Sequence, residues 1–244
     1  MYFADLHIHS KYSRATSKDC DLPHLRHWAM CKGLQLVGTG DCTHPAWRQC
    51  CAEQLTEAEP GLYRLRPEYR LNLPTPPGAA EPRFVLSGEI SSIYKQGGKT
   101  RKVHNLLLLP SLHKAEELAG RLEAIGNLHS DGRPILGLSS RDLFAIALEC
   151  CPETIFLPAH IWTPHFSMFG AFSGFSSIEE CFLDLAPLIR AAETGLSSDP
   201  AMNRRVAQLD RLFLISNSDA HSPSKLGREA NALNAPLSYP GLRA

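Results

Sequence analysis

The chain has 244 residues, of which 43% are hydrophobic and 20% charged, and its 25 basic and 25 acidic side chains give a formal net charge of zero. This size and composition are typical of one globular domain with a large core. A dedicated nucleic-acid binder is usually basic, so the charge balance argues against that class unless a local basic patch or bound metal ions supply positive charge.

The chain has eight cysteines, and no two have the Cys-x-x-Cys spacing of a closed structural zinc site. No signal peptide precedes the first predicted strand, and the longest apolar runs are far shorter than a membrane span. We therefore expect a reduced, cytoplasmic protein with free thiols and no membrane partner.

The first predicted element is a short strand at residues 3–9, where apolar and polar residues alternate. Side chains two apart on a strand point the same way, so His7 and His9 present two imidazoles on one face. Asp5 lies on that face and is placed to orient a ligating histidine. Taken alone, the pattern fits a metal site and a pair of surface histidines about equally well.

The polar loop at residues 10–18 carries Lys11 and Arg14. It is either a solvated loop or, beside a metal site, a place to hold phosphates. A helix is predicted at residues 22–32, because Pro stands at its start and Gly33 follows its end. Asp19, just before this helix, either partners the helix dipole or reaches the metals.

The next predicted strand, residues 34–40, ends in Asp41, and a helical pattern follows at residues 48–57. The proline-rich stretch at 71–82 is predicted to be a loop. A third apolar run, 83–88, ends in Glu89.

A glycine-containing turn with basic residues, 96–102, predicts a hairpin into a strand at 103–109, which carries His104 near its start. Helices are predicted at 112–125 and 143–149, and the apolar run 155–159 ends in His160.

The segment that follows His160, up to residue 177, is rich in glycine and aromatic residues. Exposed aromatic side chains beside a site suit base stacking or wedging, whereas the alternative is that they fold inward as a plug. Helical patterns come next at 178–182, 185–191 and 203–210, and the last strand, 212–215, leads to Asp219 and His221.

Several predicted strands therefore end in His, Asp or Glu. In parallel α/β sheets and barrels, functional groups gather at the carboxyl ends of the strands. Strands that alternate with helices argue for a parallel α/β barrel. The recurrence predicts a polynuclear metal site in the mouth of that barrel.

The ordered motifs resemble those of the polymerase and histidinol phosphatase (PHP) superfamily over residues 1–232. Longer strings, at residues 9–15, 37–41, 216–223 and 226–229, resemble endonuclease Q, the PHP nuclease family that nicks DNA 5′ to deaminated bases. The short motifs are DLHIHS at 5–10, TGD at 39–41, GE at 88–89, VH at 103–104, PAH at 158–160 and SDAHS at 218–222.

The resemblance implies a distorted seven-stranded (β/α) barrel that holds two or three divalent ions, Zn2+ first, with Mn2+ and Mg2+ as alternatives. Glu89 would bridge two of the ions, and Asp219 or a metal-bound hydroxide would activate the nucleophile. Glu89 and His221 are the other implied catalytic residues. The implied metal ligands are His7, His9, Asp41, Glu89, His104, His160, Asp219 and His221.

Lys11, Arg14 and Arg101 would contact phosphates, and Trp162 and Phe166 would contact the base. The implied partner is DNA that contains a damaged base, and the family also suggests a replication clamp, bound through a C-terminal region. One departure from the PHP pattern is Cys42, which stands where His usually follows the aspartate; His44 either compensates or is a turn residue.

Residues 237–243 look like a helix about to begin, and endonuclease Q relatives continue into a zinc module and a helical region. We therefore expect a PHP-like hydrolase domain at 1–232 and the truncated start of a missing C-terminal region at 233–244.

Three functions remain open from the sequence. The first is a metal-dependent endonuclease of DNA repair, which nicks 5′ to uracil, hypoxanthine, xanthine or abasic sites. The second is a PHP phosphoesterase acting on a small phosphate monoester, favoured by the neutral charge. The third is a catalytically silent PHP interaction module, which Cys42 weakly favours.

Overall fold

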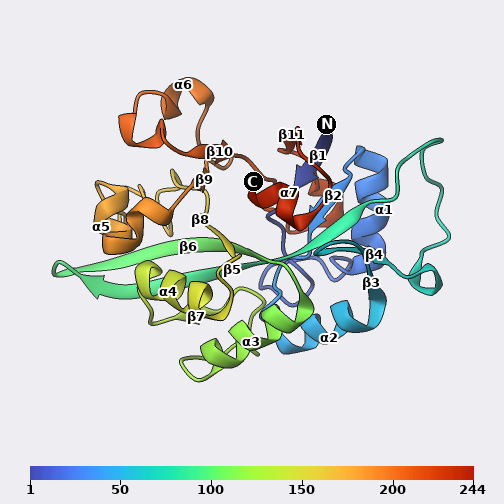
Figure 1. Ribbon diagram of the computed structural model, residues 1–244, viewed down its shortest axis with the longest axis horizontal. Coiled ribbons are helices and arrows are strands. Elements are labelled where there is room, and N and C mark those ends of the chain that lie inside the picture. Colours follow the sequence, from blue (N-terminus) through green and yellow to red (C-terminus); the bar gives the residue numbers. More distant parts are fainter.

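The computed structural model describes residues 1–244 and has a mixed α/β fold (Figure 1). Nine strands form the main sheet, and two form a separate parallel pair, β9 (Ala191–Glu193) and β10 (Phe213–Ile215). The nine are β1 (Tyr2–Asp5), β2 (Leu36–Gly38), β3 (Leu55–Glu59), β4 (Leu62–Leu65), β5 (Arg83–Gln96), β6 (Lys99–Leu109), β7 (Ile135–Leu136), β8 (Ile155–Pro158) and β11 (Asn231–Leu233).

The chain also has seven α-helices and four short 3-10 helices, and all but α7 lie between strands. The 3-10 helices are Pro67–Tyr69, Leu183–Leu188, Ala207–Leu209 and Pro223–Lys225. The α-helices are α1 (Leu22–Lys32), α2 (Pro45–Gln54), α3 (Leu112–Glu123), α4 (Ser140–Cys150), α5 (Ile178–Phe182), α6 (Pro200–Asn203) and α7 (Tyr239–Arg243).

The parallel strands β1, β2 and β5 set the position of the site. Asp5 pairs with Val37, and Val37 pairs with Phe84, so the chain leaves β1 and β2 at the same end of the sheet. Glu89 does not end its strand as predicted, because β5 continues to Gln96 as half of a long antiparallel hairpin with β6. The tight turn of this hairpin uses Gly97 and Gly98, whose φ values of 59° and 75° suit a two-residue connection.

Helices α2, α3 and α4 lie on one side of the β5–β6 hairpin, and β9, β10, α6 and α7 lie on the other (Figure 1). Helix α1 begins and ends as predicted: the side chain of Asp21 accepts from the backbone N–H of His24, and Gly33 closes the helix at φ 72°. Trp47 on α2 is buried, and its Nε1 donates to the carbonyl of Gly40 at 2.8 Å. This bond ties α2 to the loop that follows β2.

Three predicted helices were wrong in extent. The helix expected at 48–57 ends at Gln54, because Leu55 begins β3 and pairs with Leu65 on β4. The patterns at 185–191 and 203–210 give only short 3-10 turns and α6, and Ala191 already belongs to β9. In each case, strand pairing or a brief turn overrides a weak local helical preference.

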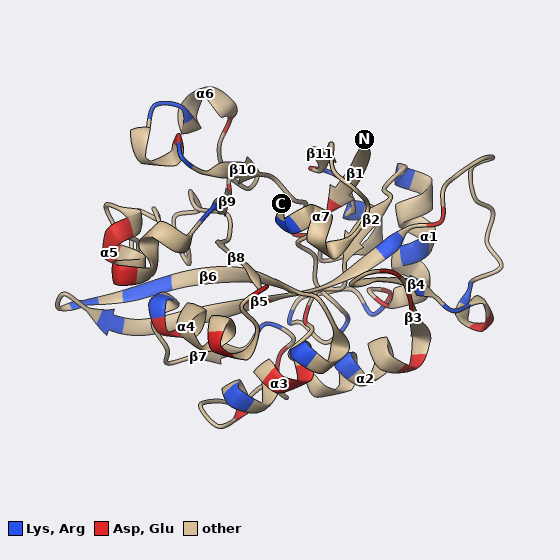
Figure 2. Cartoon of the chain, in the orientation of Figure 1, with Lys and Arg blue, Asp and Glu red and all other residues tan.

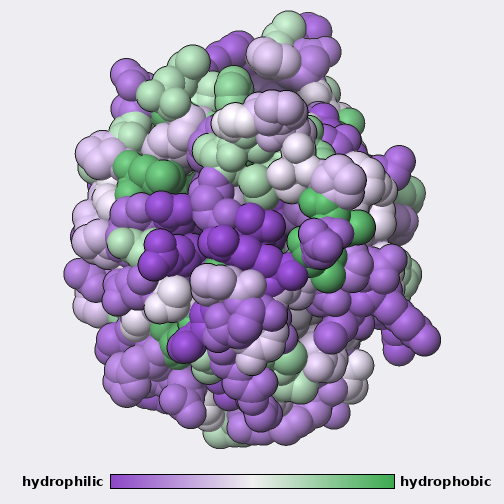
Figure 3. Space-filling model, turned by 90° about the vertical axis from the view of Figure 1, so that its right-hand side faces the viewer, coloured by the Kyte–Doolittle hydropathy of each residue, from purple (hydrophilic) through white to green (hydrophobic).

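The surface seen in Figure 3 is largely hydrophilic, with separate hydrophobic patches. None of the helices is both long enough and apolar enough to span a bilayer. The hydrogen-bonded strand ladder does not close into a ring, so the mixed α/β class is confirmed but the closed barrel is not.

Candidate metal centre

The structure brings seven of the eight predicted ligands together. His7 and His9 follow β1, Glu89 lies within β5, and Asp219 follows β10. Three groups of side chains have ligand atoms close enough to share an ion. They are His7, His9 and Glu89; Glu89, His104 and His160; and His9, Asp219 and His221.

The buried carboxylate of Glu89 is common to the first two groups. Its Oε1 lies 2.7 Å from His104 Nδ1 and 3.0 Å from His160 Nε2. The same oxygen is 3.7 Å from His7 Nε2, and Oε2 is 3.5 Å from His9 Nε2. Ligand atoms around a tetrahedral ion with bonds of about 2.0–2.1 Å are roughly 3.3 Å apart, so these spacings suit a carboxylate between two ions.

Asp219 completes the first group and joins it to the third. Its Oδ1 lies 3.1 Å from His9 Nε2, 3.8 Å from His7 Nε2 and 3.7 Å from His221 Nδ1. With 32% of its side chain exposed, Asp219 is far more accessible than the fully buried Glu89. It is therefore the carboxylate of the centre that a substrate can approach.

Three buried atoms of the centre have no hydrogen-bond partner: His7 Nε2, His9 Nε2 and Asp219 Oδ1. A buried polar atom without a partner costs about 1–3 kcal/mol. All three point into the same cluster, and imidazole and carboxylate are ligands of Zn2+, Mn2+ and related ions. The residues present therefore fit divalent metal ions.

Two further carboxylates contact the Nδ1 atoms of His7 and His9. Glu193, on β9, lies 2.9 Å through Oε2 from His7 Nδ1 and also accepts from the backbone N–H of His160. Asp41 Oδ1 lies 3.2 Å from His9 Nδ1. Each contact occupies one ring nitrogen and leaves the other, Nε2, for the centre.

Asp41 is thus placed apart from the three groups. It turns toward the loop after β1, where its Oδ2 accepts from the backbone N–H and hydroxyl of Ser10 and the hydroxyl of Ser13. The resemblance implied a ligand of a third ion at this position. The geometry instead gives Asp41 the contacts of a residue that supports His9.

The carboxylates control the charge of the two fully buried histidines. Burial alone would lower the pKa of His7, but Glu193 and Glu89 raise it well above its ordinary value. At His9, burial would also lower the pKa, but Asp219 and Asp41 raise it to about 9. The cluster therefore attracts positive charge, as a cation site should.

The backbone at the centre is held in an uncommon conformation. Asp41, His160 and Asp219 have φ values of 48°, 27° and 48°, in the left-handed region that non-glycine residues seldom adopt. The turn before Asp219 is fixed by Asp5, which accepts from the Ser218 N–H at 3.0 Å. Arg228 also holds it, by donating to the Ser218 carbonyl at 2.7 Å.

Cys42 and His44 do not join the cluster. Cys42 is buried in the core beside Gly88, and burial raises the pKa of its thiol to about 12. His44 caps α2, stacks on Tyr12 and bonds through Nε2 to the His129 carbonyl. His44 is therefore a turn and capping residue, as one of the two interpretations held.

A cavity of about 490 Å³ opens at the centre. His104, His160 and Asp219 line it together with Arg14, Arg133 and Phe166. Of the substrate-binding residues predicted from the sequence, Arg14 and Phe166 therefore face the cavity. Phe166 also contacts His104, with ring centroids 4.8 Å apart.

Lys11, Arg101 and Trp162 do not line this cavity. Lys11 is exposed, and its Nζ lies 5.7 Å from the Tyr12 ring. Trp162 donates from Nε1 to Asn203 at 2.6 Å. Arg101 stacks on Phe175 at 4.2 Å and donates to the Gly174 carbonyl. It belongs to the outer part of the β5–β6 hairpin, where Figure 2 shows basic residues in blue.

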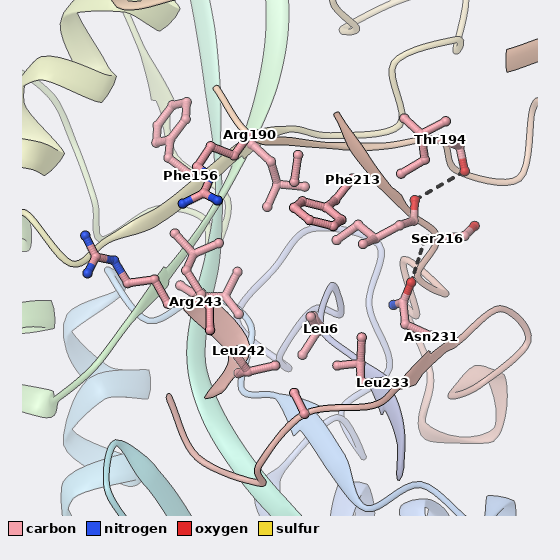
Figure 4. A pocket seen from close by; sticks show the side chains of 18 of the residues that line it. Leu6, Phe156, Arg190, Thr194, Phe213, Ser216, Asn231, Leu233, Leu242 and Arg243 are labelled. Carbon is pink, nitrogen blue, oxygen red and sulfur yellow. Dashed lines mark hydrogen bonds between the residues drawn. The ribbon is translucent and has the colours of Figure 1, made fainter. Parts of the chain in front are cut away.

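A larger cavity, of about 1160 Å³, lies elsewhere, between β9, β10, β11 and α7. Figure 4 shows Leu6, Phe156, Phe213, Leu233 and Leu242 around it, with Arg190 and Arg243 at one side. It contains none of the ligand groups. We therefore place the chemistry in the smaller cavity, where the buried His and carboxylate groups converge.

Two residues of the centre escaped sequence interpretation. Glu193 ends a strand of only three residues, which is too short to show a pattern. Arg133 lies between α3 and β7, where no periodicity points to it. For Glu193, the one available signal was a carboxylate after a short apolar stretch, as at Asp41 and Glu89.

No protein-family model matches the chain. The lesion-specific endonuclease PfuEndoQ from Pyrococcus furiosus superposes with a TM-score of 0.83 and 30% sequence identity, over 99% of this chain and 55% of that one. The chain resembles endonuclease Q. A structure of endonuclease Q with a 27-mer duplex and an abasic lesion at its active site gives the same TM-score, identity and coverage. The resemblance predicted from the sequence is thereby confirmed.

Two proteins also match the chain in sequence. The protein YqxK of Bacillus subtilis strain 168 is 32% identical over 208 residues, which are 83% of this chain and 48% of YqxK. MJ0043 of Methanocaldococcus jannaschii is 30% identical over 161 residues, 66% of this chain and 16% of MJ0043. Both are uncharacterized, and the chain spans about half of the first and less of the second.

A protein of Bifidobacterium adolescentis, proposed to be a metal-dependent phosphoesterase, shares the fold. Its TM-score is 0.54 at 16% identity, over 92% of this chain and 91% of that one. At this identity the match shows a shared fold alone, whereas the buried His and Glu groups have the spacing of metal ligands.

Proposed function

We propose that the chain is a metal-dependent endonuclease that nicks DNA 5′ to deaminated bases or abasic sites. The observation that carries the proposal is Glu89, a buried carboxylate shared by two histidine groups, in the first of which the Nε2 atoms of His7 and His9 have no hydrogen-bond partner. The similarity to endonuclease Q, one structure of which holds abasic DNA at its active site, supports DNA as the substrate.

His7, His9, Glu89 and Asp219 would hold one ion, and Glu89, His104 and His160 a second. His221 with Asp219 and His9 is the candidate set for a third. Such ions, with Zn2+ proposed before Mn2+ and Mg2+, would act as Lewis acids toward the phosphate and the attacking water.

The residues of the chain have separate tasks in this proposal. Burial would raise the pKa of Asp219, but His9 and His7 lower it, so the carboxylate stays ionised and can accept a hydrogen bond from the attacking water. His221 borders it from the same loop, with Nδ1 2.9 Å from the Asp219 carbonyl. Glu89 lies within the long strand β5 and would hold the two histidine groups at a fixed distance from each other.

Arg14 and Phe166 are the proposed substrate contacts at the cavity. Arg14 would bind a DNA phosphate and Phe166 would contact the base. Lys11, Arg101 and Trp162 do not line this cavity, so they stay predictions from the resemblance, as do the replication clamp and the cytoplasmic location.

We interpret the fold as a seven-stranded barrel. Two neighbouring pairs of its strands would be connected by contacts outside the regular strand ladder. The seven strands in order would be β1, β2, β5, β6, β8, β9 and β10. Ile161 N–H donates to the Glu193 carbonyl at 2.9 Å, between β8 and β9. Leu6 N–H donates to Asn217 Oδ1 at 2.8 Å, and an isolated bridge pairs Ile8 with Ala220, between β10 and β1.

The test uses end-labelled duplexes that carry one uracil, hypoxanthine, xanthine or abasic site, and an undamaged duplex. Each is incubated with the protein and Mg2+, Mn2+ or Zn2+, and products are mapped on a denaturing gel. We expect a single cut 5′ to the lesion and none in undamaged DNA. Asp219→Asn removes a charge with little change of shape and should abolish the cut. A wild-type protein that leaves every damaged duplex intact would overturn the proposal.

The second candidate is a phosphoesterase acting on a small monoester. The neutral net charge favours it, because DNA binding gains from an excess of positive charge. The same protein samples are therefore assayed with p-nitrophenyl phosphate. Rapid hydrolysis of this ester without any nicking of damaged DNA would favour the second candidate.

A further inference from the structure

Arg133 reaches the centre from the loop between α3 and β7. Its Nη1 donates to Glu89 Oε2 at 3.3 Å, and its side chain is 27% exposed. It lines the same cavity as His104, His160 and Asp219. It is thus the one arginine whose guanidinium bonds to a side chain of the candidate metal groups.

We propose that Arg133 is a catalytic residue that holds a non-bridging oxygen of the phosphate under attack. The proposal rests on the proposed function, because it assumes that a phosphate ester occupies the cavity. It adds a positive charge on the substrate side of Glu89.

The first argument is the number of unused donors on Arg133. A guanidinium carries five N–H donors, and the bond to Glu89 is the only hydrogen bond that this side chain makes. The side chain that carries the other donors belongs to a residue that lines the cavity. Arg presents such donors in a planar fork that matches two oxygens of a phosphate, so it suits this task better than Lys.

The second argument is that Glu89 has other partners. Its two oxygens already lie within 3.7 Å of nitrogens of four histidines. A cation in either group would offset the charge of Glu89 and weaken its hold on Arg133. The guanidinium would then be available to a phosphate in the cavity.

The third argument is that the loop bearing Arg133 is fixed before substrate arrives. The carboxylate of Asp131 accepts from the backbone N–H of Arg133 at 3.1 Å and from that of Arg14 at 3.2 Å. The N–H of Gly132 donates to the Tyr12 carbonyl at 3.0 Å. Loops far apart in sequence are therefore locked together, which reduces the cost of ordering the arginines when the substrate binds.

Gly132 makes this close approach possible. A Cβ added there would lie 2.2 Å from Asp41 Oδ2 and 2.5 Å from Ser13 Oγ. The loop that carries Arg133 thus packs directly on the side chains that support His9. This contact fixes the position of Arg133 relative to the candidate ligands.

Arg133 and Arg14 would serve different phosphates. Arg133 is partly buried at Glu89, whereas Arg14 is exposed at the rim of the same cavity. Arg133 would therefore act on any phosphate ester that reaches the metals. Arg14 would act on a neighbouring phosphate, which a polynucleotide provides and an ester with a single phosphate lacks.

The experiment compares Arg133→Gln and Arg133→Lys with wild type and with Arg121→Gln, a control at an exposed pair with Glu149. Each protein is loaded with metal, and its metal content, melting temperature and affinity for inorganic phosphate are measured. Turnover is followed on an abasic duplex, on bis(p-nitrophenyl) phosphate and on p-nitrophenyl phosphate. The lysine variant keeps a positive charge and is included because Arg133→Gln leaves one Glu89 contact unmade.

We expect Arg133→Gln to lower kcat about 100- to 1000-fold on every ester that wild type cleaves, as for loss of one transition-state donor. Phosphate affinity should fall about tenfold, with the metal content unchanged. Arg133→Lys should recover part of the loss, and Arg121→Gln should match wild type. If wild type cleaves no DNA but the small esters show this pattern, the endonuclease proposal fails and the Arg133 proposal stands.

Two results would overturn the proposal for Arg133. The first is wild-type kcat and wild-type phosphate affinity in Arg133→Gln. The second is that both Arg133 variants bind less metal or melt at a lower temperature, and that this change accounts for their whole loss of activity. Arg133 would then serve only to support Glu89. If wild type hydrolyses none of the esters, phosphate affinity alone decides: equal affinity in wild type and Arg133→Gln overturns the proposal.

Discussion

The carboxylate of Glu193 lies against Nδ1 of His7, with its oxygens 2.9 and 3.1 Å from that nitrogen. Both side chains are buried, and Asn217 donates to the same carboxylate at 2.8 Å. A carboxylate that accepts from one ring nitrogen sets the tautomer of a ligating histidine and the direction of its other nitrogen. Glu193 thus aims His7 Nε2 at Glu89 and Asp219.

Replacing Glu193 by Gln should weaken metal binding. The amide oxygen can still accept from His7, but the negative charge that makes the imidazole a stronger ligand is lost. We expect metal affinity to fall by about 10- to 100-fold, the usual effect of removing such a partner. Competition with a chromophoric chelator measures this directly.

The matched control for Glu193→Gln is Glu149→Gln, at a side chain that is 63% exposed and paired only with Arg121. Equal metal affinity in both variants and wild type would show that Glu193 does not position His7.

Metal removal should destabilise the protein. His7 Nε2, His9 Nε2 and Asp219 Oδ1 have no hydrogen-bond partner within the chain, so bound metal ions would be their partners. A ligand that binds only the native state at 100 times its Kd adds about 2.7 kcal/mol to stability. We expect elemental analysis to find more than one transition-metal ion per chain, and dialysis against EDTA to lower Tm reversibly. An unchanged Tm after metal stripping, or no bound metal after supplementation, would refute this.

The sequence allowed prediction of the ligands whose placement follows from local geometry. His7 and His9 follow β1 and bring both Nε2 atoms close to Asp219, and Asp219 and His221 follow β10. The direction of Asp41 could not be predicted, because it depends on a left-handed backbone conformation at φ 48° and on Ser10 and Ser13.

Long-range pairing limited the prediction of the fold. Glu89 was expected to end a strand, but β5 runs on because β6 pairs with it from Leu86 to Gln96. The stretch after Gln54 extends because Leu55 meets Leu65 on β4. Arg133 approaches Glu89 through a contact between two loops that no periodicity marks. These features depend on partners distant in sequence, which local patterns do not contain.

Asp41→Asn tests whether Asp41 is a support or a ligand. Asn tolerates the left-handed conformation, so the backbone should persist. Asp41 accepts from Ser10, Ser13 and His9, and an amide nitrogen cannot replace a carboxylate oxygen in those bonds. We expect a loss of stability of about 1–3 kcal/mol and weaker metal binding, with the number of ions unchanged. Loss of one ion at full affinity for the others would instead make Asp41 a ligand.

Gly132→Ala should disturb the support of His9 and the position of Arg133 together. The φ of Gly132 is not positive, so the backbone accepts alanine, and the effect comes from space alone. The new methyl group would overlap Asp41 Oδ2 and Ser13 Oγ, which cannot retreat easily because they are buried and bonded to each other at 2.8 Å. Forcing a group into such packing costs about 1–3 kcal/mol.

Gly120→Ala is the control, because Gly120 lies on an exposed turn of α3 with no atom within 4 Å of the added methyl group, and the substitution should stabilise the protein by about 0.5–1 kcal/mol. Urea unfolding measures both changes, and metal titration of each variant shows whether the strain reaches His9. A Gly132→Ala protein as stable as wild type, with unaltered metal affinity, would show that the loop at 131–133 moves freely against the loop at 10–14.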